Sequence, residues 1–291
     1  RRQFEEDRPT MQSNNPVLAK TDWGQSAQAT QYAPGQQYAP GQQYPGAGYD
    51  PNATQVRPQP PAPTGVMTID DVITKTAITL GTVVLVAALT MWGFMQGILP
   101  VNLLYPAMIV GALVSFGVVL LVSFRRQVKP GFVLAYAVIE GVFLGTISLV
   151  FELSYPGIVI PAVMGTFVAA GATLAAYKVF RIKVTNKFRK MVIIGTMAYA
   201  GVLLVNLVLS LFGINMGIIS VTGQVSWIAL LASAVGVSLA VFNLILDFDY
   251  IEQGIAMRAP ASESWRGAFG LTVTLVWLYV EILRILSYFR R

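Results

Sequence analysis

Long apolar runs occupy most of the chain after residue 68, and short polar stretches separate them. Each run is longer than a β-strand and lacks the alternation of a barrel strand, so each predicts a helix. A helix needs roughly 20 mainly apolar residues to cross a bilayer. Seven runs meet this need: 73–98, 103–124, 131–153, 157–180, 192–212, 226–246 with an amphipathic end to Glu252, and 270–289. The pattern predicts an all-α membrane protein with seven transmembrane helices.

The first 67 residues contain no such run. The hexapeptide Tyr-Ala-Pro-Gly-Gln-Gln begins at Tyr32 and again at Tyr38, and a related Tyr-Pro-Gly begins at Tyr44. Pro-Gly pairs interrupt regular structure, and no apolar face is present to be buried. We therefore expect a disordered, cytoplasmic Tyr/Gln/Pro/Gly-rich tail at residues 1–67 and a seven-helix domain at residues 68–291. The tail is either a spacer or a segment that binds a protein partner.

The composition excludes several classes of protein. Charged residues make up 12% of the chain, about half the share of a soluble protein. The absence of Cys excludes disulfides and thiolate metal sites, and the absence of His removes the usual general base and zinc ligand. We expect neither an enzyme nor a cofactor, and proton chemistry is left to carboxylates, Lys and Tyr.

The charges also predict the orientation in the membrane. Residues 1–68 carry five basic and five acidic side chains, so the net charge of +6 belongs to the remainder. Lys and Arg gather in the connections after the second, fourth and sixth apolar runs, and the three alternate connections contain none. Positive residues stay cytoplasmic. We therefore expect a multi-pass cell-membrane protein with a cytoplasmic N-terminus, whose partner is the lipid bilayer and not nucleic acid.

A few ionisable residues lie within the apolar runs, where they are costly and mark candidate functional sites. Glu140 lies midway along the third run. Glu281 lies midway along the seventh, and Arg284 follows it by three residues on the same helix face. Asp247 and Asp249 lie near the end of the sixth run.

Each candidate also has a structural interpretation. Arg284 can neutralise Glu281 in an ion pair, and Asp249 can be solvated at the cytoplasmic end. Asn243, one turn before Asp247, suits a hydrogen bond between helices. Glu140 is either a buried neutral acid or part of an ion path.

Three stretches resemble one family. They are Leu244-Ile-Leu-Asp-Phe-Asp-Tyr-Ile-Glu-Gln-Gly254, Leu278-Tyr-Val-Glu-Ile-Leu-Arg-Ile-Leu286 and Ala135-Tyr-Ala-Val-Ile-Glu-Gly-Val-Phe-Leu-Gly145. Together with seven spans they are similar to the Bax inhibitor family, the proteins with a transmembrane Bax inhibitor motif that include bacterial members of the YccA and YetJ type. The resemblance covers residues 68–289. The spacing of Gly141 and Gly145 also predicts the close approach of another helix.

The resemblance implies a fold with a central last helix and the function of a pH-sensitive calcium leak channel. In such channels an acid in the sixth helix and one in the seventh share a proton, and an Arg ending the second helix pairs with the sixth-helix acid. Carried over by motif, these residues are Asp247, Glu281 and Arg125. Two close carboxylates cannot both ionise cheaply in a low-dielectric site, and oxygen ligands suit transient calcium binding. The seventh-helix position is commonly Asp in the channels, and here it is Glu.

The resemblance also implies an alternative function. Other relatives resemble regulatory membrane proteins that modulate a membrane protease or a stress response through protein contacts. In that case the tail and the helix faces would bind partners, and the acids would be structural.

Overall fold

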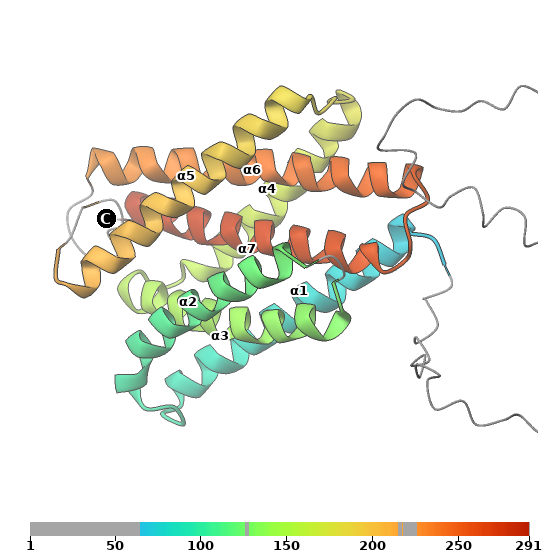
Figure 1. Ribbon diagram of the computed structural model, residues 1–291. Helices are drawn as coiled ribbons and strands as arrows, with labels where there is room; N and C mark the ends of the chain where they lie inside the picture. The colour runs from blue at the N-terminus through green and yellow to red at the C-terminus, as the bar shows by residue number, and fades with distance from the viewer. Residues whose placement is uncertain (1–64, 126–127, 215–216, 218–225, 291) are drawn as a thin grey trace, which may run out of the picture. The chain divides into compact units, whose positions relative to one another are not determined.

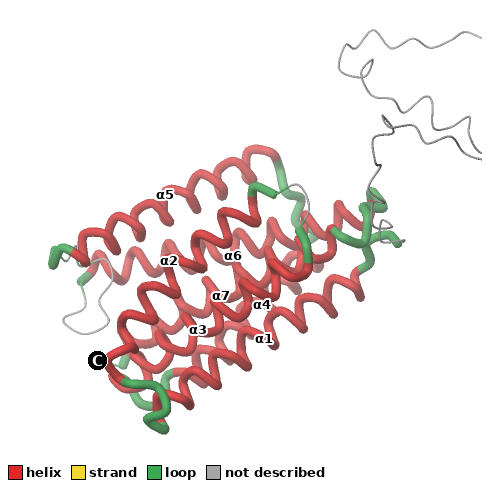
Figure 2. Tube along the Cα trace, turned by 60° about the horizontal axis from the view of Figure 1, so that its bottom comes forward, coloured by secondary structure: helices red, strands yellow, loops and turns green. Residues whose placement is uncertain are grey.

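Seven α-helices form an antiparallel bundle, and the described part of the chain contains no strand (Figures 1 and 2). The computed structural model describes residues 65–125, 128–214, 217 and 226–290. The helices are α1 (Ile69–Met95), α2 (Leu104–Ser123, preceded by the 3-10 turn Val101–Leu103), α3 (Pro130–Ser154), α4 (Val159–Val179), α5 (Asn186–Leu211), α6 (Trp227–Ala256) and α7 (Glu263–Phe289). All seven are long and apolar enough to cross a membrane. The predicted fold class is confirmed.

Polar caps define where several helices begin. The Thr68 hydroxyl accepts a hydrogen bond from the Asp71 N–H (3.2 Å), and Thr185 caps α5 in the same way through the Phe188 N–H (3.2 Å). Pro130 occupies the first turn of α3, where its missing N–H costs nothing.

Two helices begin six or seven residues earlier than the apolar pattern predicts. The structure starts α5 at Asn186 and α7 at Glu263, whereas the apolar runs start at residues 192 and 270. The first turns of both helices are polar, so hydropathy detects only the part that crosses hydrocarbon. The 27 residues of α7 span about 40 Å, more than the roughly 30 Å of a bilayer core.

Two helices share the centre of the bundle. The buried fraction of the apolar window is 61% in α3 and 50% in α7, against 17% or less in α1, α2, α4 and α5. Helix α7 packs against α1, α3, α4 and α6 (Figure 1). It is therefore central, as the resemblance implies, and α3 is buried at least as deeply.

Close contact between α1 and α3 depends on the glycine pair of α3. A Cβ atom at Gly145 would lie 2.6 Å from the Ala87 carbonyl oxygen, and one at Gly141 would lie 2.6 Å from the Val86 Cβ. No side chain larger than hydrogen fits at either position. The close helix approach predicted from this spacing is present, and its partner is α1.

The chain just before α1 is attached to the connection between α6 and α7. The Met67 N–H donates to the Ala259 carbonyl (2.7 Å), and the Ala261 N–H donates to the Gly65 carbonyl (3.0 Å). The Met67 side chain is buried, with 2% of its surface exposed. Residues 65–67 of the expected tail are thus attached to the bundle, and residues 1–64 lie outside the described residues.

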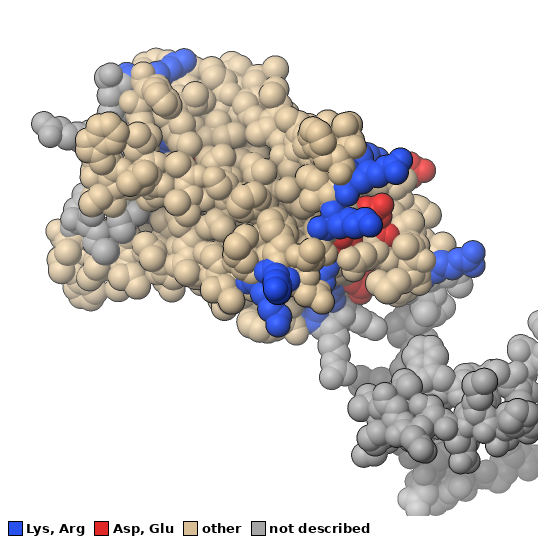
Figure 3. All heavy atoms as spheres, turned by 90° about the horizontal axis from the view of Figure 1, so that it is seen from above, with Lys and Arg blue, Asp and Glu red and all other residues tan. Residues whose placement is uncertain are grey.

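Charged side chains gather mainly at one end of the bundle, and a broad uncharged surface covers most of the rest (Figure 3). Consecutive helices run antiparallel, so the connections after α2, α4 and α6 share the end where α1 begins. These are the connections that carry Lys and Arg. An uncharged surface around helices of this length suits hydrocarbon.

Candidate functional site

A pocket of about 320 Å³ lies between α2, α6 and α7, toward the end of the bundle where α7 begins. Asp247 of α6, the acidic residue predicted from the sequence, forms part of its wall. The other lining residues are Val119, Val122, Ser123, Val128, Tyr250, Arg266, Gly267, Phe269, Gly270, Val273 and Thr274. We call this space the Asp247 pocket.

One hydrogen bond ties the Asp247 carboxylate to α7. The Thr274 hydroxyl donates to Asp247 Oδ2 at 2.6 Å. The other oxygen, Oδ1, faces the backbone of Gly270, where an added Cβ would lie 3.1 Å away. Both contacts depend on the antiparallel packing of α6 on α7, which buries Leu244 and Leu278 in one apolar cluster.

Glu281 forms a second, separate polar site that is more deeply buried. Its carboxylate is paired with Arg284 (3.1 Å), and 1% of the Glu281 side chain and 7% of the Arg284 side chain are exposed. The Tyr199 hydroxyl of α5 donates to Glu281 Oε1 (2.8 Å), and the Trp277 indole N–H donates to the same oxygen (3.3 Å). The ion pair considered from the sequence is thus part of a network that joins α5 to α7.

A glycine in α6 makes room for this network. A Cβ atom on Gly236 would lie 2.6 Å from both the Glu281 carboxyl carbon and the Tyr199 hydroxyl oxygen. Rings of Tyr199 and Trp277 stack beside it with centroids 5.8 Å apart. Helix α6 therefore approaches the ion pair at a position where it has no side chain.

The structure does not bring Asp247 and Glu281 together. The α7 partner of Asp247 is Thr274, which precedes Glu281 by seven residues and so lies about 10 Å away along the helix. Glu281 instead faces Gly236, far along α6 from Asp247. The register of two antiparallel helices sets this separation, and in this conformation the carboxylate pair implied by the resemblance is not formed.

Arg125 likewise has other partners than Asp247. Its guanidinium lies over the Phe132 ring, 4.1 Å from the centroid. Its carbonyl oxygen accepts a hydrogen bond from Arg266 (3.1 Å). Arg266 is the basic residue that lines the Asp247 pocket, and it also forms an ion pair with Glu263 (2.8 Å). The implied pairing of Arg125 with Asp247 is therefore absent from this conformation.

Glu140 is buried where α3 meets α2, with 5% of its surface exposed. The polar side chains that face it are Ser115 of α2 and Tyr136, one turn earlier on α3. No salt bridge neutralises Glu140 among the residues that the structure describes. Its surroundings suit a hydrogen-bonded acid. Glu140 does not line the Asp247 pocket, but the Tyr136 ring packs on Phe269 in the pocket wall, with ring centroids 5.0 Å apart.

The remaining candidates hold α6 to its neighbours. Asp249 forms an ion pair with Arg189 of α5 (2.8 Å), so it is more than a solvated charge. Glu252 accepts a hydrogen bond from the Tyr177 hydroxyl of α4 (2.7 Å). The Asn243 amide donates to Thr196 of α5 (2.7 Å), which is the interhelical bond expected of it.

Sequence reasoning missed the partners that define both sites. Three of these partners carry no distinctive signal in an apolar run: Thr274, Tyr199 and Gly236. Small and hydroxyl side chains are common where membrane helices pack together. Arg266 lies before the apolar run that begins at residue 270, where the hydropathy pattern predicts a connection and not a helix. Only the packing of α5 and α6 on α7 gives these residues their roles.

The described residues contain no group of three or more His, Cys, Asp or Glu side chains that could hold a metal ion. Asp247 is the only carboxylate among the described residues that line its pocket. A single carboxylate with a hydroxyl neighbour suits brief contact with a cation better than a high-affinity calcium site, which takes 6–8 oxygen ligands.

Comparison with known proteins supports the resemblance. A family model described as Bax inhibitor 1 like matches residues 15–291. The chain belongs to the Bax inhibitor 1 like family. No curated protein matches the chain. As a family member with seven apolar helices, it is a multi-pass integral membrane protein that sits in a lipid bilayer.

Proposed function

We propose that this Bax inhibitor 1 like protein is a pH-sensitive leak pathway for cations, with calcium as the candidate ion, and that the described conformation is closed. The observation that carries the proposal is the position of Asp247. This residue lines a pocket within the membrane-spanning bundle and has no salt bridge among the described residues. An acid kept at membrane depth without a basic partner is costly, which favours a functional role.

In this proposal the Asp247 pocket is the cytoplasmic mouth of the path. The basic connections share its end of the bundle, and the positive-inside rule puts such connections in the cytoplasm. The hydrogen bond from Thr274 to Asp247 joins α6 to α7 at the inner wall of the pocket. Opening separates the two helices at this contact and frees the carboxylate for a cation.

A second barrier lies deeper, at Glu281 and Arg284. The guanidinium of Arg284 repels a cation that advances along α7, and the ion pair with Glu281 fixes it there. Removing one partner of such a buried ion pair strongly destabilises the protein, because the other charge is left buried and unpaired. Glu281 therefore acts as a latch of the closed bundle through Arg284 and Tyr199 and not through Asp247.

Proton sensitivity follows from the carboxylate itself. Asp247 attracts a cation only when it is ionised, so protonation reduces the flux. The groups that face the carboxylate or share its pocket are Thr274, Tyr250 and Arg266. The chain has no His, so the proposal assigns the proton sensitivity of this pocket to the Asp247 carboxylate.

Calcium flux into liposomes that hold the purified protein tests the proposal. The Asp247→Asn variant keeps an acceptor for Thr274 and removes the charge, and we expect it to lower the flux severalfold at neutral pH. Asp70→Asn, at an exposed position in the first turn of α1, is the matched control and should leave the flux unchanged. Wild-type flux no greater than that of protein-free liposomes would overturn the proposal and favour the regulatory alternative.

A further inference from the structure

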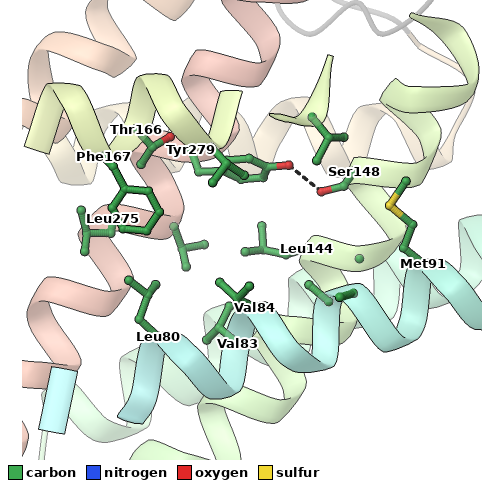
Figure 4. Close-up of a pocket in the computed structure, with 16 residues that line it drawn as sticks. Leu80, Val83, Val84, Met91, Leu144, Ser148, Thr166, Phe167, Leu275 and Tyr279 are labelled. Carbon is green, nitrogen blue, oxygen red and sulfur yellow. Dashed lines mark hydrogen bonds between the residues drawn. The ribbon is translucent and has the colours of Figure 1, made fainter. Parts of the chain in front are cut away.

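A narrow apolar groove runs between α1 and α4, with its floor on α3 and α7 (Figure 4). Its volume is about 210 Å³. Figure 4 shows Leu80, Val84 and Met91 along α1 on one side of the space and Thr166 and Phe167 of α4 on the other, with Phe167 above Leu80. We call this space the α1–α4 groove. It shares no lining residue with the Asp247 pocket.

The polar groups in the wall of the groove are already satisfied within the protein. The hydroxyls of Ser148 and Tyr279 bond to each other at 2.7 Å. The Thr166 hydroxyl donates to the Ala162 carbonyl of its own helix (2.7 Å). The remaining lining residues are apolar. Each of these hydroxyls has a partner within the protein and the rest of the wall is apolar, so the groove suits a hydrocarbon.

The mouth of the groove opens toward the membrane. Helices α1 and α4 both pack on α3 and α7 but do not pack along each other. Val84 and Phe167, one from each side of the mouth, are 52% and 53% exposed. Both belong to helices that cross the membrane, so the medium outside the mouth is the bilayer core.

We propose that the α1–α4 groove binds one acyl chain of a membrane phospholipid. The groove is smaller than the 300–1,000 Å³ typical of small-molecule pockets, and its shape suits a single chain. Side chains that line an empty space lose van der Waals contacts, and a methylene chain restores them. The lining reaches Val159, the first residue of α4, and Met91, near the end of α1. The chain therefore enters from the leaflet at that end of the bundle.

Buried floor residues allow a test that separates bound lipid from surrounding lipid. Leu144 and Val276 lie in the floor and are only 7% and 5% exposed. Lipids that merely surround the protein do not reach them. The protein is reconstituted with a phosphatidylglycerol that carries a photoreactive diazirine at the middle of one chain, and adducts are mapped by mass spectrometry. We expect adducts at both floor residues, with the mass of the intact phospholipid.

Filling the groove should remove these adducts. Ala88 lines the groove on α1, and Ala88→Phe projects a ring into the space. Ala77, also exposed on α1 but outside the groove, provides the matched control Ala77→Phe. We expect a loss of at least fivefold at the floor in the first variant and no loss in the second. Val163→Phe fills the groove from α4 and replaces Ala88→Phe if that protein does not fold. Wild-type adducts confined to exposed residues such as Leu85, or floor adducts unchanged in the filled variants, would overturn the proposal.

Discussion

Thr274 of α7 donates a 2.6 Å hydrogen bond to Asp247 of α6. A hydrogen bond from the Tyr250 hydroxyl to Glu263 (2.7 Å) also joins α6 to α7, but the Thr274 bond is the one that involves the pocket acid. In the proposed function this bond holds the cytoplasmic half of the path closed.

Removing the Thr274 hydroxyl should increase the leak. Thr274→Val keeps the shape of the side chain and deletes the donor, so α6 and α7 separate more readily and Asp247 is freed. We expect calcium flux into liposomes to rise severalfold at neutral pH. Thr272→Val is the control, because the Thr272 hydroxyl bonds only to the Ala268 carbonyl of its own helix. Equal fluxes in the two variants would remove the gating role of Thr274.

Breaking the buried ion pair should destabilise the bundle. Arg284→Met leaves Glu281 charged and buried, at a cost of about 3–5 kcal/mol in the free energy of unfolding. Glu281→Gln combined with Arg284→Met should recover part of that loss, because no charge is then stranded. Thermal unfolding in detergent is measured for Arg284→Met, for Glu281→Gln and for the double variant. If the loss of unfolding free energy in the double variant equals the sum of the losses in the two single variants, the two residues are not coupled.

Gly236 should not tolerate a methyl group. In Gly236→Ala the new Cβ meets the Glu281 carboxyl and the Tyr199 hydroxyl at 2.6 Å, and overpacking of this kind costs about 1–3 kcal/mol. Gly81→Ala in α1 is the control, since nothing lies within 4 Å of its added Cβ. We expect a lower melting temperature only for Gly236→Ala. The same melting temperature in both variants would mean that the Glu281 network accommodates the added methyl group without loss of stability.

Met67 should anchor the connection between α6 and α7. Its side chain packs with Val72 and Ile251 and lies against Gly254 and Gly267. Met67→Ala is expected to lower the free energy of unfolding by about 2–5 kcal/mol, as for other large-to-small changes in a core. Val66→Ala, at a neighbouring position that is 53% exposed, should have little effect. Comparable losses in both variants would contradict the anchoring role.

The sequence predicts the fold well because the membrane imposes simple rules. An apolar run of sufficient length has to form a helix in hydrocarbon, so all seven spans could be located. The beginnings of α5 and α7 were missed because their first turns, around Lys187 and Arg266, are polar and lie beyond the apolar runs.

The candidate site could be predicted only in part. Asp247, Glu281 and Arg284 are recognisable because a charged residue within an apolar run is rare. Their pairing depends on how far α6 is shifted along α7, and no local pattern encodes that shift. For this reason Glu281 was expected beside Asp247, whereas the structure pairs it with Arg284.

The most direct test of the proposed function is the pH profile of calcium flux into liposomes, measured for the wild type and for Asp247→Asn. Ionisation of Asp247 should make the wild-type flux rise as the pH increases. The variant should give a low flux that does not change with pH, and Asp70→Asn should follow the wild type. A wild-type profile that persists in Asp247→Asn would contradict the role of Asp247 as the proton-sensitive acid of the path.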